Sequence, residues 1–117
     1  MPESQSNSET KALTPLFSDF SEDKDMMELV DFFVTELHER VNKITDAWSS
    51  GETESLRSLA HQLKGAGGGY GFPTITESAA TLEAAILSGD EEHTGLEAKV
   101  NGLLLLCKRA IAGSRGN

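Results

Sequence analysis

The sequence lacks the features of secreted, membrane-spanning and nucleic-acid-binding proteins. Its single cysteine, Cys107, excludes an internal disulfide and fits a small buried residue in a reducing compartment. The longest apolar run, residues 103–107, is far too short to cross a bilayer, and the first residues show no signal-peptide pattern. Positive charge is scarce: 10 lysines and arginines stand against 19 aspartates and glutamates, a formal net charge of −9. An acidic chain argues against binding to nucleic acid or to an anionic membrane. We therefore expect a cytoplasmic protein that binds neither.

No segment alternates apolar and polar residues as a strand would, whereas helical spacing is clear. The clearest apolar stripe repeats every three or four residues and consists of Met27, Val30, Val34, Leu37, Val41, Ile44 and Trp48. Ser21 and the acidic Glu22 and Asp23 are suited to the start of this helix, and Ser-Ser-Gly at residues 49–51 ends it. The sequence predicts one long amphipathic helix here.

Three further helices are predicted after it. One starts at Glu52 or Thr53 and runs to about Gly71. A Phe-Pro pair then breaks the chain, and Thr-Ile-Thr-Glu at residues 74–77 is a capping-box pattern for the third helix. A Ser-Gly-Asp turn precedes the last helix, which begins between residues 90 and 94. The inward residues predicted for these last two helices are Ile75, Ala79, Leu82, Ile86, Leu96, Val100, Leu103, Cys107 and Ile111.

Short links between the helices favour antiparallel neighbours, and 117 residues support one small core. We predict an all-α fold: an up-down-up-down antiparallel four-helix bundle with a short additional N-terminal helix over residues 12–20, interrupted by Pro15. The predicted domain spans residues 13–112. Residues 1–12 are expected to be a disordered polar tail, and residues 113–117 a frayed C-terminal tail. The initial methionine and the polar tail favour a stand-alone protein.

The most informative segment is residues 59–72. It places His61 and Lys64 three residues apart and has glycine at five of the seven positions after the lysine. The packing stripe of the same helix consists of Leu56, Leu59, Leu63 and Tyr70. On a helical wheel His61 points roughly 170° away from the centre of this stripe. Gly65 and Gly68 lie within about 40° of His61, and Lys64 lies about 60° to one side. One exposed face therefore carries an imidazole, an ammonium and little other side-chain bulk.

A histidine beside a cation on such a face suits phosphoryl transfer. Neutral imidazole is nucleophilic near physiological pH because the ordinary pKa of histidine is about 6.5. Charge on the equatorial phosphoryl oxygens needs a nearby donor, and a flexible lysine supplies one. The missing side chains would let a partner's active site reach His61 without steric conflict.

This segment resembles the core of the histidine-containing phosphotransfer (HPt) domains of multistep two-component signalling. That core is His-x-x-Lys-Gly, followed by small residues and a second glycine. In this sequence it reads His61, Lys64, Gly65 and, after five intervening residues, Gly71. The order and lengths of the flanking helices extend the resemblance to residues 13–112.

The resemblance implies a function. His61 would accept a phosphoryl group, normally through Nε2, from the phospho-aspartate of one receiver domain and pass it to an aspartate of another. The implied partners are response-regulator receiver domains and a hybrid sensor kinase. Mg²⁺ and most catalytic groups would be supplied by the receiver. The chain would therefore need no cofactor of its own, bind no nucleotide, show no turnover alone and act as a monomer.

The resemblance also implies roles for neighbouring residues. Lys64 should draw phosphate oxygens toward the histidine and stabilise its phosphorylated form. Gly65 and Gly68 should allow close docking of a receiver, and Gly71 should serve helix packing or termination. Gln62 points away from the histidine on the wheel and is assigned only a contact at the rim of the docking surface. The sequence does not identify the group that orients the other imidazole nitrogen.

Two other functions fit the same residues. One is a chemotaxis-type kinase substrate domain, phosphorylated by an ATP-binding domain elsewhere. The other is a non-catalytic helical binding module. Labelling by a kinase with ATP, but not by a phosphorylated receiver, would favour the first. Failure to label with any phosphodonor would favour the second.

Two further features need an interpretation. The three histidines, His38, His61 and His93, occupy different elements without ligand-like spacing, so no metal site is expected. The triple glycine at residues 67–69 exceeds the family's common Ser/Ala content, and Tyr70 replaces a typical aliphatic residue. Either a partner docks unusually close to the glycines, or the helix is weakened there so that its end can kink.

Overall fold

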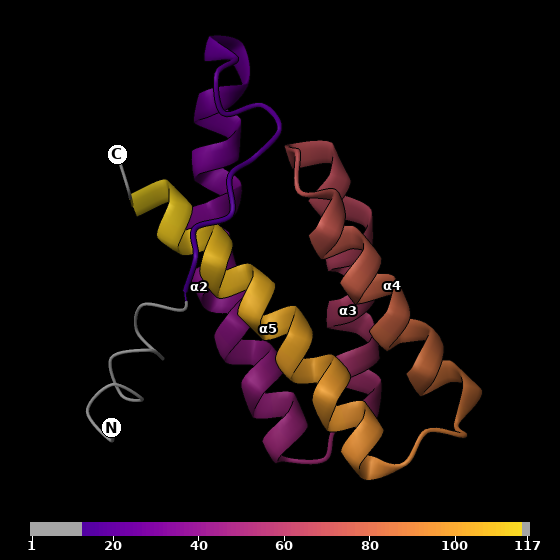
Figure 1. Ribbon diagram of the computed structural model, residues 1–117. Helices are drawn as coiled ribbons and strands as arrows, with labels where there is room; N and C mark the ends of the chain where they lie inside the picture. The colour runs from indigo at the N-terminus through magenta and orange to yellow at the C-terminus, as the bar shows by residue number, and fades with distance from the viewer. Residues whose placement is uncertain (1–12, 116–117) are drawn as a thin grey trace, which may run out of the picture.

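The computed structural model describes residues 13–115, without the side chains of the last two of them. In this range the chain forms four α-helices and no strand: α2 (Lys24–Ser49), α3 (Thr53–Gly67), α4 (Pro73–Ser88) and α5 (His93–Arg115). A 3-10 turn, η1 (Gly68–Tyr70), follows α3 directly. The prediction of an all-α chain is confirmed for the described residues (Figure 1).

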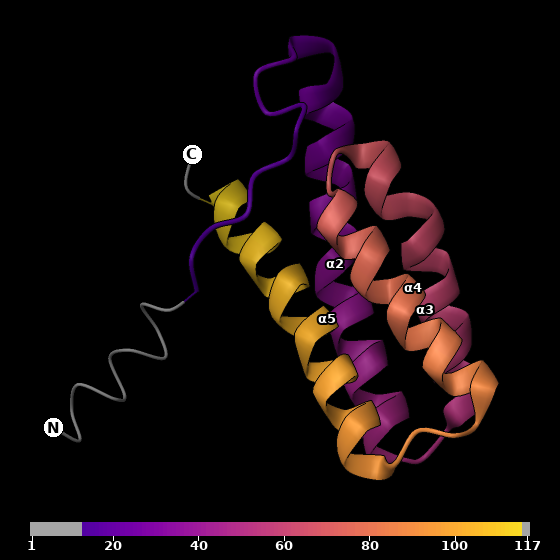
Figure 2. The same ribbon diagram turned by 45° about the vertical axis from the view of Figure 1, so that its right-hand side comes forward.

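The four helices enclose one core. Each helix packs on the next along the chain, and α5 returns to pack on α2, so the helices form a ring. Successive helices run in opposite directions in Figures 1 and 2. All four helices contribute side chains with no exposed surface, among them Leu37, Ile44, Leu63, Ile75, Leu82, Leu103 and Cys107. The apolar stripes of the sequence therefore meet in one interior.

Helix α2 begins where the sequence predicts. The side chain of Asp23 accepts a hydrogen bond from the backbone N–H of Asp25 at 3.0 Å and so satisfies one of the donors left unpaired at a helix start. The stripe differs from the prediction at three residues, one of which is Ala47, a buried residue that the predicted stripe omits. Met27 is 42% exposed, because the first turns of α2 extend past the ends of the other helices (Figure 1). Phe33, which the predicted stripe omits, is buried and stacks on the ring of Tyr70 with centroids 4.6 Å apart.

The short helix predicted over residues 12–20 is absent from the described part of that segment. Residues 13–18 have no regular structure, and turns follow them. The prediction failed because the backbone here bonds to another element: the N–H of Leu16 donates to the carbonyl of Arg109 on α5 at 2.9 Å. Pro15 has no N–H to offer a helix. The segment therefore lies as an irregular strap against α5.

The structure describes only part of the two predicted tails. The disordered tail assigned to residues 1–12 lies outside the described residues. At the other end α5 continues through Arg115, so the first residues of the segment predicted as a frayed tail are helical. Gly113 is buried, and the carbonyl of Leu16 lies where a Cβ at this position would be. Contact with the N-terminal strap thus holds the last turns of α5.

The capping box predicted at residues 74–77 does not form. Helix α4 begins at Pro73, and its N-cap residue makes no side-chain hydrogen bond. Proline suits this first position because its missing N–H would be unpaired there in any case. The hydroxyl of Thr76 is used elsewhere: it donates to the carbonyl of Lys64 at 2.9 Å and accepts from the N–H of Gly68 at 2.7 Å. Thr76 therefore connects α4 to the end of α3.

Candidate functional site

His61 lies on the exposed face of α3. Its side chain is 61% exposed. Ala60 before it and Leu63 after it are fully buried. Because the buried positions of α3 face the interior of the ring, the helical turn directs the histidine outward. The exposed position predicted for His61 is confirmed.

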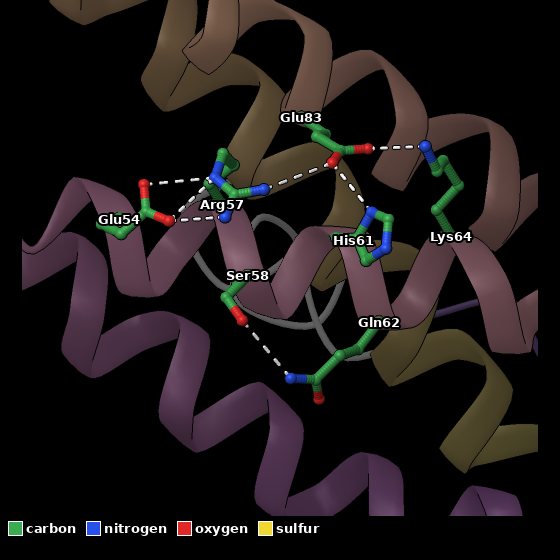
Figure 3. Close-up of polar contacts among 7 residues, drawn as sticks. All are labelled: Glu54, Arg57, Ser58, His61, Gln62, Lys64 and Glu83. Carbon is green, nitrogen blue, oxygen red and sulfur yellow. Dashed lines mark hydrogen bonds and ion pairs between the residues drawn. The ribbon is translucent and has the colours of Figure 1, made fainter.

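One carboxylate from α4 lies against the imidazole. Nδ1 of His61 is 2.9 Å from Oε2 of Glu83, and Nζ of Lys64 is 2.7 Å from Oε1 of the same carboxylate (Figure 3). Arg57 approaches from one turn earlier on α3, with Nη1 3.6 Å from Oε2. The Glu83 side chain is only 8% exposed. Helix α3 thus directs three donor side chains at one largely buried carboxylate of α4.

These contacts favour the ionised form of Glu83. The hydrogen bond from Lys64 is the main cause that lowers the pKa of Glu83 below its ordinary value of 4.5. Burial acts in the opposite direction, and the hydrogen bond from His61 lowers this pKa further. An ionised carboxylate only accepts hydrogen bonds, so Nδ1 of His61 carries the hydrogen. In the neutral imidazole the lone pair is then on Nε2, which lies on the side of the ring away from Glu83 (Figure 3).

This geometry supplies the parts of a nitrogen nucleophile. The His61 side chain is largely exposed, and its Nδ1 is held by a carboxylate that can balance a positive charge on the ring. The Lys64 side chain is 40% exposed and lies one turn after His61 on the same helix. Such a site can take a phosphoryl group on Nε2 and meet its oxygens with a cation.

Residues 28–113 match the family model of the Hpt domain, a span that includes all four residues of this cluster. The chain belongs to the Hpt domain family. Its members carry phosphoryl groups on histidine in two-component signalling, where they interact with receiver domains and kinases. Comparisons with curated proteins and with solved structures gave no match.

The surface predicted to be clear of side chains is present on this Hpt domain. Gly65 and Gly69 are exposed, and a Cβ added at either would meet nothing within 4 Å. At Gly68 it would meet only the hydroxyl of Thr76 at 3.5 Å, an ordinary contact. Because no neighbour occupies these positions, the three glycines leave the end of α3 open to a partner.

Gly67 serves the Hpt domain differently. It is buried, and a Cβ here would lie 2.8 Å from the hydroxyl of Thr76, closer than packed atoms tolerate. That hydroxyl stands between the carbonyl of Lys64 and the N–H of Gly68, where an α-helical hydrogen bond would otherwise form. The chain then tightens into η1. The α-helix thus ends at Gly67 and the chain continues as a 3-10 turn over residues 68–70, while close docking of a partner at these glycines stays a prediction.

Gly71 ends this segment of the Hpt domain. Its φ of +87° is in the left-handed region that favours glycine. A Cβ would also overlap the hydroxyl of Ser18 and lie 2.8 Å from the backbone nitrogen of Asp19. The N–H of Asp19 donates to the carbonyl of Gly71 at 2.8 Å. Termination and close packing, the two alternatives predicted for Gly71, both occur.

Gln62 points away from the imidazole, as the wheel predicts (Figure 3). Its Oε1 accepts a hydrogen bond from Nη1 of Arg40 on α2 at 2.8 Å. Its Nε2 lies 3.5 Å from the hydroxyl of Ser58. Gln62 therefore links the Hpt site to α2 and does not contact His61 through its side chain.

Sequence reasoning missed Glu83 and Arg57. For Glu83 the pattern contained a usable clue: on the wheel of α4 it lies within about 60° of the inward Ala79 and Ile86. A charged residue facing a bundle needs a partner, because burying an unpaired charge is costly. Arg57 lies four residues before His61 on the same helix face. Neither partnership could be assigned, because both depend on how α3 and α4 are aligned.

The remaining histidines lie on other elements. His38 is exposed on α2, and His93 begins α5, where it stacks on Trp48 with ring centroids 4.8 Å apart. Within residues 13–115, no three side chains of the metal-binding types gather. In the same range, no helix has the length and apolar character needed to cross a membrane.

Proposed function

We propose that this Hpt domain is the intermediate of a multistep phosphorelay. His61 accepts a phosphoryl group from the phospho-aspartate of one receiver domain and passes it to an aspartate of another. The observation that carries the proposal is the pairing of an exposed imidazole with the ionised, largely buried Glu83. This pairing leaves Nε2 as the nucleophile and directs it away from the protein.

The chemical step needs no proton transfer on the carrier. The lone pair of Nε2 forms a bond to phosphorus while the bond from phosphorus to the aspartyl oxygen breaks, and the aspartate leaves as a carboxylate with the electron pair. The ring then carries the phosphoryl group on Nε2 and a hydrogen on Nδ1, with one positive charge. Glu83 lies against that Nδ1 and stabilises the charged ring. Transfer to the second receiver is the same step in reverse.

Lys64 supports the phosphoryl group in this scheme. An ammonium has three N–H donors, and one of them reaches Oε1 of Glu83. The others can donate to phosphoryl oxygens after a small rotation of the long side chain. Lys64 therefore acts as a catalytic residue for the phosphoryl group and as a partner of Glu83.

The receiver docks over the glycine surface and supplies the rest of the chemistry. Gly65 and Gly68 permit close approach, Gln62 makes a contact at the rim, and Gly71 keeps the end of the segment in place. Mg²⁺ is held by the receiver, and the carrier contributes no cofactor and no turnover of its own. The functional unit is residues 13–112 as an up-down-up-down antiparallel bundle, monomeric and cytoplasmic, working between receivers and a hybrid sensor kinase.

Phosphotransfer profiling tests this proposal. The chain is mixed with each phosphorylated receiver from its source, and separately with each histidine kinase and ATP. We expect label from at least one phosphorylated receiver, onward transfer to a second receiver, and none of either with His61→Gln. His38→Gln, which replaces another exposed histidine, is the matched control and should label normally. Label from a kinase alone would instead assign a kinase substrate domain, and no label from any donor a binding module.

A further inference from the structure

Arg57 shares its acidic partner with the histidine. Its Nη1 lies 3.6 Å from Oε2 of Glu83, the same oxygen that is 2.9 Å from Nδ1 of His61. Lys64 occupies the other oxygen, Oε1. Figure 3 shows the arginine on one side of the carboxylate and the lysine on the other. Two cations from α3 therefore flank one carboxylate of α4.

A second acidic residue orients the arginine. Nε of Arg57 lies 3.2 and 3.1 Å from the two carboxylate oxygens of Glu54, and Nη2 also donates to that carboxylate. This contact uses one edge of the planar guanidinium and leaves Nη1 directed at Glu83 (Figure 3). The Arg57 side chain is 27% exposed, so the protein surface restricts it further. The arginine is thus held in place without help from the lysine.

A phosphoryl group on His61 would affect the contacts of the two cations with Glu83 differently. Lys64 is the cation that the proposed function directs toward phosphoryl oxygens, and such a move weakens its contact with Oε1 of Glu83. If Lys64 were the only cation beside Glu83, its departure would leave a largely buried carboxylate without a partner, and such a carboxylate tends to take up a proton. A protonated Glu83 would no longer fix the hydrogen on Nδ1 of His61. A second cation on the carboxylate prevents this outcome.

We propose that Arg57 is a positioning residue that holds the Glu83 carboxylate against Nδ1 of His61 when Lys64 turns to the phosphoryl group. The part of this proposal that concerns Lys64 rests on the proposed function. The part that concerns Arg57 and Glu83 applies to the unphosphorylated chain as well. Arg57 acts through Glu83 and does not touch the phosphoryl group.

The protonation pattern of the imidazole gives a direct test in the unphosphorylated full chain. Long-range ¹H–¹⁵N spectra report which ring nitrogen carries the hydrogen. We expect the Nδ1–H form in the wild type and only small changes in Arg57→Met or Lys64→Met alone, because one cation remains in each. In the double variant the balance should shift to Nε2–H, and by more than the two single shifts added together. In the Lys64→Met background, Arg57→Lys should keep the Nδ1–H form that Arg57→Met loses, because lysine also supplies a cation.

Arg40→Met is the matched control, because Arg40 is another partly buried arginine that bonds to α3, through Gln62 and not through Glu83. It should leave the imidazole pattern unchanged in both backgrounds. If Arg57→Met in the Lys64→Met background shifts the pattern no more than Arg40→Met does, the proposal is overturned. If Arg57→Met fails to fold by circular dichroism, Arg57→Gln retains a polar side chain at this position and takes its place in the same comparison.

The lifetime of the phosphohistidine gives a second readout. With phosphoramidate as a small phosphodonor, no receiver is needed. We expect the phosphohistidine of Arg57→Met to hydrolyse at least about threefold faster than that of Arg40→Met, and an equal lifetime would contradict the proposal. The two proposals fail separately: absence of any label on His61 would contradict the proposed function, while the imidazole pattern would still decide the role of Arg57.

Discussion

Glu83 and His61 are 22 residues apart in the sequence, and their side chains meet at 2.9 Å across α3 and α4. The carboxylate is largely buried and the imidazole largely exposed. This asymmetry decides the chemistry of the ring, because the buried oxygen accepts a hydrogen bond from Nδ1–H and leaves Nε2 on the side of the ring away from Glu83. The relationship also ties the site to the fold, since it exists only while α3 and α4 keep their alignment.

Acid should weaken the fold through Glu83. Its pKa is lowered below 4.5 in the folded chain, so the unfolded chain takes up this proton first as the pH falls. The stabilisation is complete at a pH above the pKa of Glu83 in the unfolded chain, and it is lost as the pH falls through the pKa of Glu83 in the folded chain. We expect the free energy of unfolding, measured with urea, to fall more steeply below about pH 4.5 in the wild type than in Glu83→Gln. Glu77→Gln, an exposed site on the same helix, should keep the wild-type slope, and equal slopes in all three would contradict the assignment.

A side chain at Gly65 should block docking without unfolding the domain. Nothing lies within 4 Å of a Cβ there, and leucine favours a helix over glycine by up to about 1 kcal/mol. We expect Gly65→Leu to retain its thermal stability but to bind a cognate receiver at least about tenfold more weakly by calorimetry. Gly102→Leu on α5, where a Cβ is equally unopposed, is the control and should bind normally. Normal binding by Gly65→Leu would show that the receiver docks elsewhere.

Gly71 should be required for stability. Its φ of +87° and the closeness of Ser18 and Asp19 leave no room for a methyl group. We expect Gly71→Ala to lower the free energy of unfolding by about 1–3 kcal/mol in urea titrations. Gly69→Ala, where a Cβ is unopposed, should stay within about 0.5 kcal/mol of the wild type. A similar loss in both variants would mean that the strain at Gly71 is not the cause.

The thiol of Cys107 should be unreactive in the folded chain. Burial is the main cause that raises the pKa of its thiol to about 12. A thiol reagent near pH 8 should therefore label it at the rate of unfolding, and labelling in 6 M denaturant should be immediate. Because the unfolded thiol ionises at lower pH than the folded one, stability should also fall as the pH rises from about 9 toward 12. Fast labelling of the native chain would contradict the burial of this residue.

The helices and the exposed histidine could be predicted because both follow from local spacing. The apolar stripes through Val34, Leu63 and Leu82 indicate which face of each helix is buried. The exposed position of His61 on α3 follows from the regular rotation per residue of the same helix. The first helix start was predicted for a similar reason, since Asp23 acts within its own helix. Predictions of this kind need no knowledge of the neighbouring helices.

The predictions that failed depended on distant partners. The capping box assigned to α4 did not form because the hydroxyl of Thr76 bonds to the end of α3. The helix expected over residues 12–20 is missing from the described residues because Leu16 bonds to α5. Glu83 was missed as the partner of His61 for the same reason, because helical periodicity contains no information on how two helices align.

The identity of the His61 nitrogen that carries the phosphoryl group is the most direct test of the proposed phosphotransfer chemistry. The chain is labelled with ¹⁵N, phosphorylated by a receiver, and followed by ³¹P and long-range ¹H–¹⁵N spectra. We predict a phosphoryl group on Nε2 of His61, a hydrogen retained on Nδ1, and no such signal in His61→Gln. A phosphoryl group on Nδ1, on another residue, or on the His61→Gln variant would contradict it.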